Sequence, residues 1–165
     1  VWKEVASKYS GRGGVDMAVV DGRLYAGGGC DDSSTALSCV EVYDAKTNVW
    51  QEVAPMNTAR SRLAMAVVEG RLYAGGGCDD SGTTFSRVEV YDAKTNVWQE
   101  LAPMHTARYR LVMAVVAGRL YAGVGYDGSD TRLSWVEVYD AKTNVWQALS
   151  PMYTSRTRSP QPCHV

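Results

Sequence analysis

Arginine is the residue type whose spacing in this chain most clearly suggests chemistry. One arginine recurs every 48 residues, and a second follows it two positions later in three of the four copies, giving Arg12, Arg60, Arg62, Arg108, Arg110, Arg156 and Arg158. The guanidinium group presents a planar fork of donors that suits a carboxylate or a phosphate. The pattern predicts a pocket for an acidic or phosphorylated peptide segment. The alternative is that each arginine pairs with a nearby aspartate and merely solvates the surface.

The composition excludes several other classes of ligand. The 165 residues carry a net charge of −1, so no bulk electrostatic attraction favours nucleic acid or a membrane surface. No apolar run approaches the roughly 18 residues needed to span a bilayer, and the first ten residues do not resemble a signal peptide. The four cysteines lack metal-binding spacing and predict reduced thiols in a cytoplasmic protein.

The arginines belong to a larger repeat that must position them. The sequence VEVYDAKTNVWQ occurs without change at 40–51, 88–99 and 136–147. A fixed period of this size indicates structural units that bury their apolar faces against one another. The tryptophans at 50, 98 and 146 are expected to pack between such units.

Each unit has four strand-like segments and no helical pattern. In the middle copy they are LAMAVV (63–68), RLYAGGG (71–77), RVEVY (87–91) and VWQEL (97–101). Gly70 supplies the positive φ of a tight hairpin turn, and the residues at 92–96 are typical of turns. Four short antiparallel strands per unit predict an all-β propeller with three four-stranded blades.

The strand count leaves the ring incomplete. Propellers have about four to eight blades, and an open stack exposes strand edges. We expect a second copy of the chain to complete a six-bladed ring as a homodimer; alternatively, the chain is a piece of a longer one. VWKEV at 1–5 adds a thirteenth strand, so either it or the segment at 145–149 completes the last blade. Pro160 and Pro162 interrupt the segment where the next inner strand would lie.

The repeat resembles a known family. The double glycine after tyrosine, the later VEVYD and the tryptophan seven residues on are similar to the kelch repeat, and the combination with LAPM most resembles the BTB–kelch ubiquitin-ligase adaptors. The resemblance implies one kelch-repeat region over 1–165, with repeats at 1–48, 49–96 and 97–144 and a partial repeat at 145–165. It also implies that Tyr126 and the recurring arginines, which lie in the linkers between one predicted blade and the next, touch a captured peptide. Cys30 and Cys78 occupy the slots that match Tyr126.

The repeats differ from one another mainly at one end of the predicted blade. The third-to-fourth turn is DAKTN in all three copies, whereas the linker and the loop between the second and third strands vary. Tyr109, for example, stands where the other copies have Ser61 and Thr157. Because function is usually carried by loops on a rigid frame, we expect the varied end, with Tyr109 and the arginines, to bind the ligand.

These observations predict a non-catalytic protein-interaction module with no catalytic residue, metal site or cofactor. A designed or fragmentary propeller without an evolved ligand is one alternative. A sialidase-like or copper-oxidase-like carbohydrate enzyme is another, but only two histidines are present, which makes a poor copper site. Because the arginines are expected on exposed loops, replacing Arg60, Arg108 and Arg156 is expected to remove binding and leave folding intact.

Overall fold

The computed structural model describes residues 11–152, which form three four-stranded antiparallel sheets and contain no helix. The strands are β1 (Asp16–Val20), β2 (Arg23–Gly27), β3 (Val40–Asp44), β4 (Val49–Val53), β5 (Ala64–Val68), β6 (Arg71–Gly75), β7 (Val88–Asp92), β8 (Val97–Glu100), β9 (Val112–Val116), β10 (Arg119–Gly123), β11 (Val136–Asp140) and β12 (Val145–Ala148). Blade 1 is β1–β4, blade 2 is β5–β8 and blade 3 is β9–β12. The predicted all-β fold of three four-stranded blades is confirmed.

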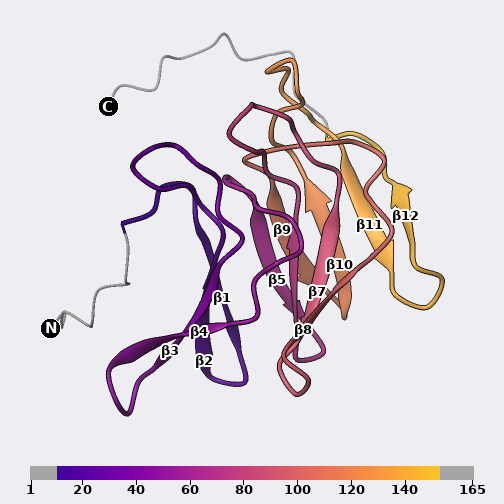
Figure 1. Cartoon of the computed structure of the whole chain (residues 1–165). Helices are drawn as coiled ribbons and strands as arrows, with labels where there is room; N and C mark the ends of the chain where they lie inside the picture. The colour runs from indigo at the N-terminus through magenta and orange to yellow at the C-terminus, as the bar shows by residue number, and fades with distance from the viewer. Residues whose placement is uncertain (1–10, 153–165) are drawn as a thin grey trace, which may run out of the picture.

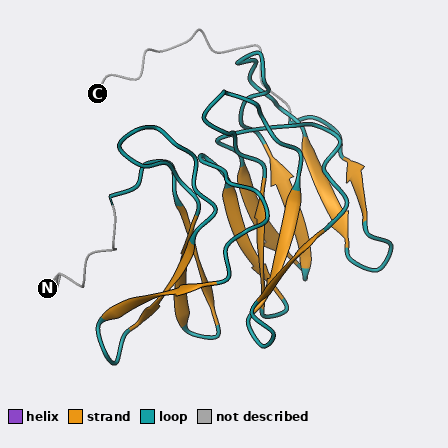
Figure 2. Ribbon diagram, in the orientation of Figure 1, coloured by secondary structure: helices purple, strands orange, loops and turns teal. Residues whose placement is uncertain are grey.

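The blades stand side by side with their first strands innermost. Strand β5 contacts both β1 and β9, so these three strands form the inner wall of the assembly. Figure 1 shows the three sheets in sequence along the chain, and Figure 2 shows that the long loops gather at one end and the short turns at the other. Within the described residues there is accordingly no helix that could cross a membrane.

The short turns follow from their residue types. Each hairpin between the first two strands has two central residues with positive φ: Asp21 and Gly22 in blade 1, Glu69 and Gly70 in blade 2, and Ala117 and Gly118 in blade 3. Two successive positive φ values make a type I′ turn, whose twist matches that of the flanking strands. We call this end, with the three DAKTN turns, the turn end, and the opposite end the loop end.

Adjacent blades pack face to face through apolar side chains, and we call each such interface a seam. The seam between blades 1 and 2 buries Val20, Val40 and Val42 from one side against Met65, Leu72, Ala74 and Trp98 from the other. The seam between blades 2 and 3 repeats this arrangement with Ala66, Val68, Val88 and Val90 against Leu120, Ala122 and Trp146. Trp98 and Trp146 therefore pack between blades, as predicted, whereas Trp50 of blade 1 packs on Tyr43 of its own blade.

Hydrogen bonds close each seam at its outer edge. Trp98 Nε1 donates to Ala54 O at 2.8 Å, and Ala54 N donates to Asn96 Oδ1 at 2.9 Å, so blade 2 holds the chain as it leaves blade 1. Trp146 and Asn144 hold Ala102 in the same way.

The outer strand of blade 3 is β12, from residues 145–148, which pairs with β11. The predicted strand at 1–5 and the prolines at 160 and 162 lie outside the described residues. The predicted repeat windows are offset from the blades, because a window such as 49–96 begins with the outer strand of one blade and continues into the next.

Candidate functional site

The first arginine of each linker is buried and belongs to the framework. Arg60 precedes β5, and its Nη2 lies 2.6 Å from Oε1 of Glu89 on β7 of the same blade. Its Nη1 donates to Gly76 O and Arg87 O, both at 2.9 Å, and the residue has no exposed surface. Burial lowers the pKa of the Arg60 guanidinium, while the charge of Glu89 opposes that shift.

The same pair recurs in the other blades. Arg108 Nη2 lies 2.6 Å from Glu137 Oε1, and Arg12 pairs with Glu41; both arginine side chains are buried. The prediction that Arg12, Arg60 and Arg108 line an accessible pocket is therefore wrong in this structure. The predicted alternative, pairing with a surface aspartate, is also wrong, because the partner is a buried glutamate on the third strand of the blade.

The buried glutamates bind backbone N–H groups of the linkers in addition to the arginine side chains. Glu89 accepts hydrogen bonds from Asn57 N at 2.7 Å and Thr58 N at 3.1 Å, and Glu137 accepts from His105 N at 2.7 Å. A carboxylate that receives both a guanidinium and backbone N–H groups is well satisfied although it is buried. The ion pair thus fastens each linker across the loop end of the blade it enters.

The second arginine of each linker has the opposite environment. Arg62 and Arg110 are exposed and adopt left-handed backbone conformations, with φ values of 54° and 50°. Gly14, which takes this position in blade 1, has a φ of 65°, so the substitution suits the backbone that all three copies share. Arg62 N donates to Gly14 O at 2.7 Å and Arg110 N donates to Arg62 O at 2.8 Å, which links the three blades around the inner rim.

These two arginines border a hollow at the loop end of the inner wall. The hollow has a volume of about 760 Å³ and is lined by residues 13–17, 62–65 and 110–113, with Cys30. A volume of this order suits a small ligand or part of a peptide. Asp16, inside the hollow, is engaged by the backbone N–H of Met65 at 2.7 Å.

An aromatic pair stands next to Arg62. The rings of Tyr109 and Tyr126 stack with centroids 5.6 Å apart, and the guanidinium carbon of Arg62 lies 5.8 Å from the Tyr109 ring centroid. A guanidinium held over a ring keeps its N–H edges available for a carboxylate. The Tyr109 hydroxyl donates to Asp130, and this hydrogen bond raises the pKa of the Tyr109 phenol. Arg62, Arg110, Tyr109 and Tyr126 are thus brought together at the rim.

Other predicted positions do not join this group. Arg156 and Arg158 lie outside the described residues. Cys30 lines the hollow, whereas Cys78, in the equivalent slot of blade 2, is buried. Cys30, Cys39 and Cys78 are free thiols, and among the described residues no three His, Cys, Asp or Glu side chains are grouped to hold a metal ion.

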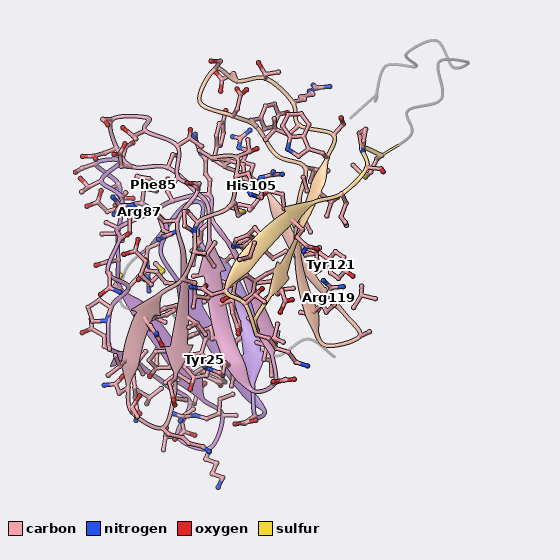
Figure 3. The ribbon with its side chains drawn as sticks, turned by 90° about the vertical axis from the view of Figure 1, so that its right-hand side faces the viewer. Tyr25, Phe85, Arg87, His105, Arg119 and Tyr121 are labelled. Carbon is pink, nitrogen blue, oxygen red and sulfur yellow. The ribbon has the colours of Figure 1, made fainter. Side chains whose placement is uncertain are left out.

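Sequence reasoning missed Asp130 and the three buried glutamates. Glu41, Glu89 and Glu137 recur at one position of a strand that is buried on both faces, and the first arginine recurs in step with them. That coincidence was the available signal. Figure 3 shows Phe85, Arg87 and His105 toward the loop end, with Arg119 and Tyr121 lower on blade 3.

Comparison with known families agrees with the repeat and the fold. The model of the KLHDC2/KLHL20/DRC7 kelch-repeats domain matches residues 2–165. The chain belongs to this kelch-repeat family. An F-box/kelch-repeat protein of Arabidopsis thaliana is 44% identical over 46 residues, which is 28% of this kelch chain and 12% of that protein.

A solved structure shares the kelch chain's architecture. The structure of YjhT matches with a TM-score of 0.77 at 18% identity, covering 90% of this chain and 54% of that one. This similarity shows the fold. The chain spans about half the length of YjhT and a much smaller share of the plant relative. Kelch-repeat domains generally mediate protein–protein interaction.

Proposed function

We propose that the chain is a non-catalytic binding module that takes an acidic peptide segment at the loop end, with Arg62 and Arg110 as the anchoring residues. The observation that carries the proposal is their exposure on either side of one hollow, with Arg62 held over Tyr109. Two exposed guanidinium groups suit carboxylates or a phosphate of an extended peptide, and the stacked tyrosines suit an apolar neighbour of the acidic group.

We also propose a cellular role and location for this binding module. In the BTB–kelch adaptors that the sequence resembles, such a site receives a substrate of a ubiquitin ligase. We propose the same role for this chain, in the cytoplasm. The three free thiols of the described residues suit a reducing compartment.

Fluorescence anisotropy with labelled peptides tests the binding site. Acidic and phosphorylated peptides are compared with versions in which Asn and Gln replace Asp and Glu. We expect the double variant Arg62→Ala/Arg110→Ala to weaken binding of the acidic peptide at least tenfold and to leave the melting temperature unchanged. Arg119→Ala removes an exposed arginine near the turn end and serves as the matched control. Equal binding by the double variant and the control would disprove the assignment.

We also propose that two copies form a six-bladed ring as a homodimer. The three blades of the described residues do not close a ring, and the outward faces of blades 1 and 3 expose Met17, Val19, Val112 and Val116. Light scattering coupled to size exclusion should give about 36 kDa, twice the chain mass of 18.0 kDa. A constant mass of one chain over a wide concentration range would exclude the ring.

A further inference from the structure

The two internal seams are built around one repeated contact. A methyl group added at Gly27 of blade 1 would lie 3.0 Å from Sδ and 3.1 Å from Cε of Met65 in blade 2. At Gly75 of blade 2, the side chain of Met113 from blade 3 occupies the same place. In each seam, a thioether on the inner strand of one blade therefore fills the space left by a glycine on the second strand of the preceding blade.

The chain carries an unmatched half of this contact at each end. Met17 on β1 is equivalent to Met65 and Met113, but it is 43% exposed, compared with 6% for Met65. Gly123 on β10 is equivalent to Gly27 and Gly75, and the atoms nearest to its added methyl group all belong to Val136 of its own blade. Beside Gly123 lies a hollow of about 310 Å³, lined by Val112, Ala114, Tyr121, Gly123, Val124 and Val136.

The exposure of the valines near Met17 and Gly123 also differs between the end blades and the internal seams. Val20 and Val68, which face the next blade, are 2% and 7% exposed, whereas the equivalent Val116 of blade 3 is 60% exposed. On the other side, Val19 of blade 1 is 57% exposed, whereas the equivalent Val67 packs against the core of the first seam. Val19 and Val116 are thus more exposed than Val115, which is 39% exposed and whose equivalent Val67 faces the preceding blade.

From these contacts we infer that blade 3 of one copy receives blade 1 of a second copy, with Met17 of the second copy entering the hollow beside Gly123. This inference rests on the proposed two-copy ring and specifies its seam. The occupant is a second copy because this chain carries both halves of the contact and already assembles them twice within itself. Two copies then make two identical seams and leave neither end face exposed.

Mass measurement on single-residue variants tests the seam. Val116→Asp places a charge on the open face of blade 3, and Val19→Asp places one on the open face of blade 1. We expect each variant to change from about 36 kDa to the 18.0 kDa of one chain at concentrations where the wild type is dimeric. Far-ultraviolet circular dichroism and the melting curve establish that the variants are folded.

Val97→Asp is the matched control. Val97 is 55% exposed, and its equivalents Val49 and Val145 are 43% and 46% exposed, so exposure at this position does not depend on whether the blade is internal. The Val97→Asp variant should keep the dimer mass. An equimolar mixture of Val19→Asp and Val116→Asp contains a pair with one unaltered seam, so the mixture should recover part of the dimer that neither variant forms alone.

The mass measurements distinguish failure of the proposed seam from failure of the proposed two-copy ring. A dimeric wild type whose mass is unaffected by Val19→Asp and Val116→Asp would overturn the seam and leave the two-copy ring standing. A wild type that is always monomeric would overturn both. A ladder of masses above two chains would also overturn the closed pair, because an end-to-end contact that does not close produces an open filament.

Discussion

Arg60 and Glu89 form a buried ion pair across the loop end of blade 2, with Nη2 of the arginine 2.6 Å from Oε1 of the glutamate. The same pair joins Arg108 to Glu137 in blade 3. Each arginine also donates to two backbone carbonyls, one just after the second strand of its blade and one just before the third. The pair therefore anchors the linker from which the second, exposed arginine projects.

Replacing Arg60 should lower the free energy of unfolding, whereas replacing Arg62 should leave it nearly unchanged. Arg60→Ala leaves the Glu89 carboxylate buried without its cation, which costs about 3–5 kcal/mol of the free energy of unfolding. Arg62→Ala removes an exposed side chain two residues away and should change this free energy by no more than about 0.5 kcal/mol. Urea unfolding measures both. Similar losses in the two variants would contradict the division of roles.

Gly77 and Gly82 allow backbone strain to be separated from a steric clash. Both have positive φ, at 90° and 84°, but a methyl group on Gly77 would lie 2.6 Å from Ser61 O, whereas nothing lies within 4 Å of one on Gly82. Gly82→Ala should cost about 1–2 kcal/mol of the free energy of unfolding, from backbone conformation alone.

Gly77→Ala should cost clearly more, because the clash is with the backbone of the linker and no flexible side chain can move aside. Thermal unfolding of the two variants gives the comparison. Equal melting temperatures would mean that the close approach of Gly77 to Ser61 is not required.

Asn96 should stabilise the first seam through its side-chain oxygen. That oxygen accepts hydrogen bonds from Ala54 N at 2.9 Å and from the Tyr91 hydroxyl at 2.8 Å. Asn96→Gly keeps the positive φ of 56° without strain but removes both bonds, at a cost of about 1–3 kcal/mol.

Asn96→Asp retains an acceptor at the same place and is the matched control. Chemical denaturation should show most of the wild-type stability in the aspartate variant. If the glycine and aspartate variants are equally destabilised, the hydrogen bonds are not the source of the effect.

Alkaline conditions should destabilise the fold through its buried tyrosines. Burial raises the pKa of Tyr73, Tyr91 and Tyr139 above the ordinary value of 10.0. Because the unfolded chain then loses its phenolic protons at a lower pH than the folded one, the stabilisation is complete below about pH 10 and is lost as pH rises through the folded pKa values.

Melting temperatures followed above pH 10 measure this loss, and the ultraviolet absorbance of tyrosinate reports the ionisation. Tyr73→Phe removes one of the three groups and should make the decline less steep. A decline of the same steepness in this variant would assign the alkaline sensitivity to other groups.

The blades could be predicted from sequence because several signals coincide in each repeat. The expected segments at 63–68, 71–77, 87–91 and 97–101 correspond to strands at 64–68, 71–75, 88–92 and 97–100. Gly70 located the hairpin, and the constant and varied turns were assigned to opposite ends from strand direction alone. These features depend on local conformation and on a period of two, both of which are visible in a single chain.

The roles of the arginines could not be predicted from the same information. Arg60 and Arg62 are two residues apart in a linker without regular structure, so no periodicity indicates which side chain points inward. Alternation along RVEVY puts Glu89 on the face opposite that of Val88 and Val90, and a sheet exposed on one side would solvate that face. In this fold both faces of the strand are covered, and the buried carboxylate therefore needs the nearby guanidinium.

The contact of methionine with glycine across each seam bears on how such a chain can change in length. Gly27 and Met65 belong to different blades but lie closer along the chain than one repeat of 48 residues. Tandem duplication of any 48-residue stretch, whatever its first residue, thus adds one such glycine and one such methionine in the correct order. Duplication or loss of such a stretch can therefore insert or delete a blade without new complementary mutations at the junction.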